Sequence, residues 1–398
     1  MKNILIAIRS IFKKGRHNVM KIVSLGIGLA VGLVLIAKVY FEQSYDDFYP
    51  DRDRVYQVWA KYQQNGGELK DYPQTSGGIA PTMQQQIPEI ETVTRYTSFG
   101  DWTFTMTDTK MKYSGRCIIA DSCFFDILPR PMLIGNAKEV LSIPMYVLVS
   151  SRIAKNIGGD VIGKNFTVDS SPGRTMTIGG VFEEVPENSH SRYDVIVSMA
   201  SAGRFMWEGS PTNMLGNDRY ISYVKLHKGV NPLALEEQVH TFVNSYFPPE
   251  EQQKTGFNIG FSFHELDGLH KELPQVKRMT WILSLLAFAL IFTAVMNYIL
   301  IVISSIVNRS KEVAVHKCYG ASENNIHGMM FGEALVHIVL SLILALLLIL
   351  AFRGTVEELL ATSLDSLLLS NGSLVLLGIC ILVFFVSGFM PGSLYARI

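Results

Sequence analysis

Four long apolar runs constrain this chain more than any other feature of its sequence. A bilayer core of about 30 Å is crossed by about 20 apolar residues in a helix. Hydrophobic residues make up 48% of the chain and charged residues only 18%, so a membrane can hold a large part of it. With their uncharged flanks, the runs predict four transmembrane helices, at residues 19–41, 278–307, 329–352 and 372–391.

The few ionisable residues within these runs lie toward their ends. Lys21 and Lys38 stand near the two ends of the first run, where long basic side chains can extend to the membrane interface. Glu333 and His337, one helical turn apart, lie near the cytoplasmic end of the third run; they are candidate interfacial residues, for anchoring or for contact with a partner. We find no charge near a bilayer centre, which argues against ion transport.

The first run is longer than the core of a signal peptide, and no small-x-small cleavage site follows it, so we interpret it as a retained helix. Residues 1–18 carry apolar side chains at helical spacing beside basic ones, which predicts a cytoplasmic interfacial helix. Basic residues gather in residues 1–21 and in the loop 308–328, whereas the loop 353–371 is acidic. The positive-inside rule therefore places both termini, with the tail 392–398, in the cytoplasm of a bacterial inner membrane and residues 42–277 outside.

The outer segment is long enough to contain its own hydrophobic core. Short β-rich runs at 55–60, 146–149, 175–181 and 220–226 are separated by turn signals at 65–67 and 171–173. Helical patterns occur at 81–86, 151–157 and 232–246. We expect an α+β domain in two lobes, inserted between transmembrane helices 1 and 2.

No pattern in the sequence indicates catalysis. Residues 158–165 differ from a phosphate-binding P-loop in their last residue and stand between a helix and a strand, so we interpret them as a turn. His190, His264 and His270 lack metal-ligand spacing and fit packing or surface positions. Cys117 and Cys123 share the outer segment, but spacing does not decide whether they are bridged. The 35 basic and 35 acidic residues balance, so nucleic acid is not an expected ligand.

The segment after the second predicted helix carries the most specific pattern. It is helix-like and charged, with Gly320 suited to a helix end and Ser322 suited to start the next helix. It resembles the cytoplasmic signature of MacB/FtsX-type ABC transporter permeases, although His316 replaces the usual arginine. The resemblance implies that this segment contacts an ATPase; the candidate contact residues are Arg309, Lys311, Glu312, Val313, Ala314, Val315, His316, Lys317, Gly320, Ala321 and Ser322.

The resemblance extends along the chain. Residues 44–50, 53–56, 88–90, 162–164 and 180–190 are similar to the MacB-like periplasmic core domain of permeases of the Bacteroidetes-like subgroup. It implies a permease subunit without cofactors of its own, coupled to a cytoplasmic ABC ATPase dimer that binds ATP and magnesium. A second copy of the permease or a second permease half, a periplasmic adaptor or substrate protein, and membrane lipids are the further implied partners.

We therefore expect ATP-driven mechanotransmission to the outer domain, for efflux of a small molecule, peptide or lipoprotein. The alternative is a non-transport regulator that activates a cell-wall hydrolase or senses antimicrobial compounds. Many chains of this subgroup continue into a second copy of the same unit, so the chain is either a half-length permease that forms a dimer or a truncated one.

Overall fold

The protein is described by a computed structural model that covers residues 18–304, 315, 318, 319, 323–368, 378, 379 and 382. The chain divides into two compact units, each considered by itself. The first unit comprises Met1–Ser44 and Glu272–Ile398, and the second, the outer domain, comprises Tyr45–Lys271.

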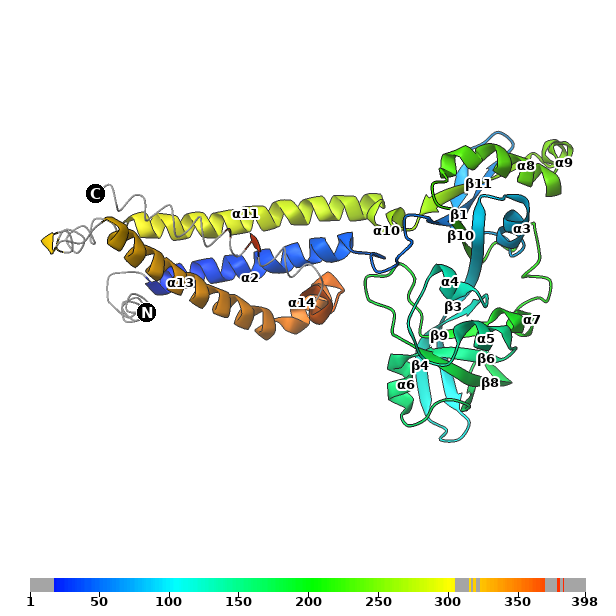
Figure 1. Cartoon of the computed structure of the whole chain (residues 1–398), viewed down its shortest axis with the longest axis horizontal. Helices are drawn as coiled ribbons and strands as arrows, with labels where there is room; N and C mark the ends of the chain where they lie inside the picture. Colours follow the sequence, from blue (N-terminus) through cyan, green and yellow to red (C-terminus); the bar gives the residue numbers. More distant parts are fainter. Residues whose placement is uncertain are drawn as a thin grey trace. The chain divides into compact units, whose positions relative to one another are not determined.

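Among the described residues of the first unit, three helices are long and apolar enough to cross a membrane (Figure 1). They are α2 (Asn18–Gln43), α11 (Pro274–Ser304) and the Gly332–Ala351 part of α13 (Glu323–Ala351). The short helices α14 (Arg353–Leu360) and α15 (Leu364–Leu368) follow. The predicted fourth transmembrane helix, 372–391, lies outside the described residues except for 378, 379 and 382, and so remains a prediction.

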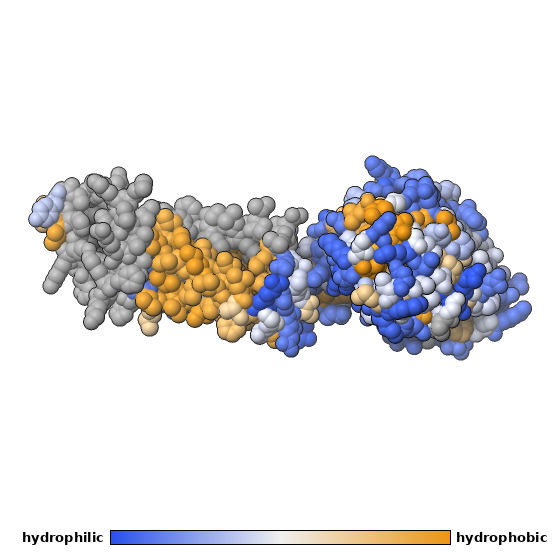
Figure 2. Space-filling view, turned by 90° about the horizontal axis from the view of Figure 1, so that it is seen from below, coloured by the Kyte–Doolittle hydropathy of each residue, from blue (hydrophilic) through white to orange (hydrophobic). Residues whose placement is uncertain are grey.

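Small residues let the helices of this unit approach one another closely. A Cβ atom at Gly28 of α2 would collide with Ala294 of α11, and one at Gly32 would collide with Ile291. Close approach of this kind drives helix association in lipid, where the hydrophobic effect between helices is absent. Large apolar side chains point outward instead and give the helices their hydrophobic surface (Figure 2): Trp281, Leu285, Phe288, Phe292, Ile343, Leu346 and Leu350.

The outer domain is built on one mixed sheet of 11 strands with the order β11-β1-β10-β3-β4-β9-β6-β8-β5, where β2 pairs with β1, and β7 pairs with β3 and β8. The strands are β1 (Val55–Gln64), β2 (Lys70–Tyr72), β3 (Ile90–Met106), β4 (Lys112–Ala120), β5 (Met132–Ile134), β6 (Tyr146–Ser150), β7 (Asn165–Val168), β8 (Ser171–Phe182), β9 (Val195–Ser198), β10 (Ile221–Leu226) and β11 (Phe257–Glu265).

Helices lie between these strands in the chain. They are α3 (Ile79–Gln86), α4 (Phe124–Ile127), α5 (Ala137–Ser142), α6 (Ser151–Ile157), η1 (Met199–Ser201), α7 (Ala202–Phe205), η2 (Pro232–Leu235), α8 (Glu236–Tyr246), α9 (Pro249–Thr255) and α10 (Gly268–Lys271). The predicted α+β character is confirmed, as are the predicted strand and helix positions to within about four residues at their ends. The turn predicted at 171–173 is wrong, because the chain turns at 169–170 and β8 already begins at residue 171.

Three hydrophobic clusters fill the outer domain, and the long strand β3 contributes to each of them. Val93 joins the cluster under α3 and α8, Tyr96 joins the one under α4 and α5, and Phe104 joins the third, beside α6. The predicted lobes therefore share one continuous sheet (Figure 1).

The first and last strands of the outer domain are neighbours although they are distant in sequence. β1 and β11 pair antiparallel from Tyr56↔Glu265 to Gln64↔Phe257. Along the chain, β1 follows α2 and β11 precedes α11. Along the chain, the two paired strands are thus connected to α2 through residues 44–54 and to α11 through residues 266–273, which include α10.

We predict that Gly28→Val destabilises the packing of α2 on α11. The added side chain collides with Ala294, and overpacking of this kind costs about 1–3 kcal/mol. The measurement is SDS-induced unfolding of the purified full chain. Val31→Leu is the matched control, because Val31 is exposed on the same helix; equal unfolding midpoints for the two variants would contradict the close contact.

Candidate functional site

The predicted coupling segment lies largely outside the described residues. Within it the structure describes Val315, Cys318 and Tyr319, and all three are exposed. The candidate contacts Arg309, Lys311, Glu312, Val313, Ala314, His316, Lys317, Gly320, Ala321 and Ser322 remain predictions from the sequence.

Polar side chains that the sequence placed at the membrane interface lie inside the helix bundle. Lys21 is 1% exposed and Glu333 and His337 are 7% and 1% exposed, so all three side chains are buried among the helices, and the interfacial role of Glu333 and His337 remains a prediction. The His337 Nδ1 atom lies 3.3 Å from the Tyr298 hydroxyl of α11, and the Lys21 Nζ atom lies 3.5 Å from Asn18 Oδ1. The partner of His337 is on a neighbouring helix and that of Lys21 is on the same helix; such polar partners offset the cost of placing a polar group in an apolar interior.

Lys38 is also buried, at 7% exposed, instead of extending to the interface. Its Nζ atom lies 2.6 Å from Glu42 Oε1 and donates a hydrogen bond of 2.7 Å to Thr362 Oγ1. Glu42 is 5% exposed, so the ion pair is nearly dry. Removing one member of such a pair leaves an uncompensated buried charge.

An ion-pair network joins the two chain connections of the outer domain; we call its residues Asp47, Arg52, Asp267 and Lys271 the basal network. The Lys271 Nζ atom lies 2.8 Å from both Asp47 Oδ1 and Asp267 Oδ1, and Arg52 contacts the same two carboxylates at 2.8 and 3.1 Å. Burial lowers the pKa of Lys271, but hydrogen bonds to Asp267 and Asp47 outweigh it and hold that pKa above its usual value.

Hydrogen bonds of the backbone and a ring contact reinforce this junction. The Leu266 N–H donates to the Val55 carbonyl oxygen at 2.9 Å, and the rings of Tyr45 and His270 stack with centroids 3.4 Å apart. The residues just before β1 and just after β11 are therefore fixed to each other. The predicted packing role of His270 is confirmed by this contact.

A second polar network anchors the residues that follow α2. His190 Nδ1 lies 2.8 Å from Asp46 Oδ2, and His190 Nε2 lies 2.5 Å from the Tyr223 hydroxyl. A carboxylate only accepts hydrogen bonds, so Nδ1 carries a proton. Burial keeps the pKa of Tyr223 well above its usual value, which leaves the hydroxyl protonated. Asp46 is 0% exposed and has a φ of 61°, a conformation that Asp tolerates better than most residues.

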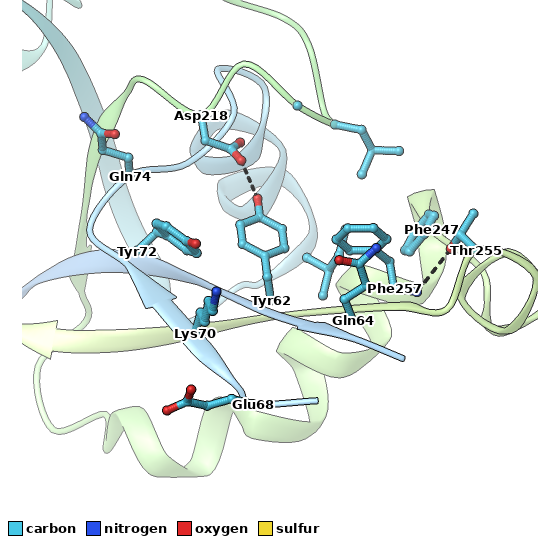
Figure 3. A pocket seen from close by; sticks show the side chains of 13 residues that line it. Tyr62, Gln64, Glu68, Lys70, Tyr72, Gln74, Asp218, Phe247, Thr255 and Phe257 are labelled. Carbon is cyan, nitrogen blue, oxygen red and sulfur yellow. Dashed lines mark hydrogen bonds between the residues drawn. The ribbon is translucent and has the colours of Figure 1, made fainter. Parts of the chain in front are cut away.

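A groove of about 900 Å³ lies at the other end of β1 and β11 (Figure 3). The pairing register of the strands determines which side chains form the floor of the groove. Tyr62 lies opposite Lys70 of β2 on one side and opposite Ile259 of β11 on the other, so the three side chains share one face. Tyr72 lies diagonally from Tyr62, with ring centroids 5.7 Å apart. The lining residues define the distal groove: Tyr62, Gln64, Glu68, Lys70, Tyr72, Gln74, Leu215, Gly216, Asp218, Phe247, Thr255, Phe257 and Ile259.

One wall of the groove is held by Asp218. Its Oδ2 atom accepts a hydrogen bond of 2.6 Å from the Tyr62 hydroxyl, and its Oδ1 atom accepts one of 2.5 Å from Ser76. Burial, followed by the hydrogen bond to Asp218, raises the pKa of Tyr62, so its hydroxyl remains protonated. Each carboxylate oxygen of Asp218 therefore accepts one hydrogen bond that positions the loop.

The remaining residues that the sequence analysis considered for chemistry take part in turns or in packing. Residues 158–165 join α6 to β7 with left-handed glycines at 158, 159 and 163, which confirms the predicted turn. His264 stacks on Trp59, and burial lowers its pKa. Cys117 and Cys123 are free thiols. Among the described residues no group of three His, Cys, Asp or Glu side chains is arranged to hold a metal ion.

Comparison with known families and structures gives consistent matches. Residues 20–242 match the family described as MacB-like periplasmic core domain, and residues 284–398 match the FtsX-like permease C-terminal family. No curated protein matches the chain.

Two solved structures are similar to the outer domain. A crystallised domain of a protein named as a permease from Porphyromonas gingivalis is 32% identical, with a TM-score of 0.50, and the match covers 55% of this chain and 91% of that one. The extracellular domain of the noncanonic ABC-type transporter YknZ from Gram-positive bacteria is 10% identical, with a TM-score of 0.36, and the match covers 52% of this chain and 98% of that one. The first was crystallised as a separate domain, and the outer domain here has its own hydrophobic clusters, so we expect residues 45–271 to fold as an isolated domain.

We predict that His190→Ala destabilises the isolated outer domain by about 3 kcal/mol, because it removes the donor to the Oδ2 atom of the buried Asp46 carboxylate and leaves only the bonds from Ser189 and the backbone N–H of residue 190 to Oδ1. For a domain of this size the melting temperature falls by about 6–12 °C. The measurement is thermal unfolding by circular dichroism. His227→Ala, at an exposed position, is the control; equal melting temperatures for the two variants would exclude a stabilising role for the Asp46–His190–Tyr223 network.

Proposed function

Because the chain belongs to the family of ABC transporter permeases with a MacB-like periplasmic core domain, we propose that it transmits ATP-driven motion from a separate cytoplasmic ATPase to its outer domain. The permease has no expected cofactor of its own, and ATP with magnesium belongs to the partner. We assign the motion to export of a small molecule, peptide or lipoprotein across or away from the inner membrane.

The pairing of β1 with β11 is the observation that carries this proposal. A relative movement of α2 and α11 would be passed to two neighbouring strands, because residues 44–54 join α2 to β1 and residues 266–273 join β11 to α11. The basal network joins the two connections, so the movement reaches the sheet instead of being absorbed by a flexible linker. Packed elements transmit such displacements because their interiors deform little.

In this proposal the ATPase contacts the 308–322 segment, which connects α11 to α13. Both helices pack with α2 in one cluster that includes Leu29, Tyr298 and Ile338. Movement of the segment is therefore delivered to helices that lead to the outer domain. Two copies of the permease, each with four transmembrane helices and cytoplasmic termini, form the proposed complex with the ATPase dimer.

We predict that reversing the charges of the segment, with Glu312→Lys and Lys317→Glu, abolishes capture of a cytoplasmic ABC ATPase. The measurement is affinity capture of the tagged chain from native membranes in mild detergent with nucleotide present, followed by identification of the bound ATPase. Reversed charges remove the attraction expected at this contact.

The control reverses a charge pair in the loop predicted to lie outside, with Arg353→Glu and Glu357→Lys. These two side chains form an ion pair at the surface of α14, which the reversal keeps, while it removes the contact of Arg353 with Asp365 and the hydrogen bond that Glu357 accepts from the Leu364 N–H. We expect this variant to capture the ATPase as the wild type does. Failure of the wild type to capture any ATPase would overturn the proposed coupling.

We also predict that Asp267→Asn uncouples hydrolysis from movement of the outer domain. Asp267 contacts both Arg52 and Lys271, and each partly exposed ion pair contributes about 1 kcal/mol at most, so folding is retained. In the captured complex we expect near-normal ATP hydrolysis but a smaller ATP-dependent change in the distance between spin labels at Leu233→Cys of the two copies.

Asp169→Asn is the matched control, because Asp169 pairs with Lys112 on the surface of the same domain but outside the basal network. It should leave both hydrolysis and the distance change as in the wild type. An unchanged distance response in Asp267→Asn would remove the basal network from the path of transmission.

A further inference from the structure

α2 has no direct chain connection to the predicted coupling segment. Residues 308–322 lie between α11 and α13, and the whole outer domain separates them from α2. Yet α2 leads to β1, one of the two strands that receive movement in the proposed function. Apolar side chains pack these helices together, but in lipid such contacts can be exchanged for contacts with lipid tails. Transmission through α2 therefore calls for a contact that is specific in direction.

The residues after α13 continue its hydrogen bonding; we call residues 353–368, which comprise α14 and α15, the outer strap. The Phe352 N–H donates to the Leu348 carbonyl oxygen at 3.0 Å, and the Val356 N–H donates to the Phe352 carbonyl oxygen at the same distance. These bonds bridge the boundary between α13 and α14. The outer strap is therefore joined to α13 by the single residue Phe352 and not by a flexible linker.

Contacts within the outer strap hold α14 against α15. The Arg353 guanidinium lies 2.9 Å from Glu357 Oε1 and 3.0 Å from Asp365 Oδ2. The same Glu357 oxygen accepts a hydrogen bond of 2.9 Å from the Leu364 N–H. Between the two helices Ala361 has a φ of 48°, the left-handed conformation that often ends a helix and turns the chain. The outer strap thus has one defined shape.

Two kinds of contact fasten the outer strap to α2. Leu364 is 2% exposed and belongs to the hydrophobic cluster that includes Leu29 and Val34 of α2. Thr362, which is 6% exposed, accepts a hydrogen bond of 2.7 Å from the Lys38 ammonium of α2. The apolar contact holds the strap against the helix, whereas the hydrogen bond also fixes its direction, because hydrogen bonds weaken steeply away from their preferred geometry.

Lys38 makes this contact near the end of α2 that leads to the outer domain. Its Nζ atom lies 2.6 Å from Glu42 Oε1 and 5.1 Å from the centre of the Phe41 ring, and the ion pair offsets the cost of burying the ammonium. A shift of the outer strap along α2 by about 1 Å would lengthen the bond to Thr362 beyond hydrogen-bonding range. Because such charge-assisted bonds are about twice as strong as neutral ones, the outer strap and this end of α2 move together.

We infer that Lys38 is a positioning residue that latches the outer strap to α2, so that movement of α13 is passed to α2 and from it to β1. The inference rests on the proposed function for the source of the movement, since α13 follows the segment that contacts the ATPase in that proposal. The latch itself requires no ATPase. It gives α2 the connection to the coupling segment that the order of the chain does not provide.

The first test measures the latch by hydrogen–deuterium exchange of the purified full chain in lipid nanodiscs. Thr362→Val keeps the shape of the side chain but removes the hydroxyl, and we expect the amides of residues 361–368 to exchange about tenfold faster than in the wild type. Thr362→Ser retains the hydroxyl and should restore slow exchange. Thr355→Val is the matched control, because Thr355 is exposed on the same strap; it should exchange as the wild type does.

The second test measures transmission in the complex captured with the ATPase, with spin labels at Leu233→Cys of the two copies, an 82% exposed position. Thr362→Val should show near-normal ATP hydrolysis but a smaller ATP-dependent distance change, and Thr362→Ser should behave as the wild type does.

Equal exchange in Thr362→Val and Thr355→Val would overturn the latch. Faster exchange in Thr362→Val with an unaltered distance change would overturn the positioning role, because a latch that only stabilises the bundle predicts this result. Faster exchange together with a wild type that captures no ATPase would refute the coupling and the source of the movement but not the latch.

Discussion

The antiparallel pairing of β1 with β11 is the interaction on which the rest of the structure depends. It brings together two segments about two hundred residues apart in sequence and makes neighbours of the strands that follow α2 and precede α11. The sheet topology therefore places side by side the two segments that connect the outer domain to the rest of the chain. The basal network and the Asp46–His190–Tyr223 network then fix the residues around these connections.

The membrane part and the outer domain are each held together by different interactions. In the helix bundle, Gly28 and Gly32 allow close backbone approach, and Lys38 finds Glu42 and Thr362 as partners away from lipid. In the outer domain, water drives burial, and β3 joins three hydrophobic clusters into one sheet. Both solutions produce parts that move as units, which is what transmission of a displacement requires.

Local patterns in the sequence were sufficient for the elements but not for the contacts between them. Apolar length predicted α2 and α11, and a short run rich in β-forming residues predicted β1, because these signals are contained within one segment. The burial of Lys38 depends on Thr362, which is 324 positions away, so composition alone indicated snorkelling instead. Likewise, the histidine of the 180–190 motif was visible, but its partners Asp46 and Tyr223 come from other strands and turns.

The distal groove is another feature that local sequence patterns could not predict. Its floor needs Tyr62, Lys70 and Ile259 on one face, an arrangement fixed by the register of three strands and by no local motif. A shift of one residue in either pairing would turn these side chains to the opposite face. The register of β1 with β11 that receives movement from the helices is thus the same register that builds the groove. In the proposed function, a displacement of one strand along the other would therefore alter the groove directly.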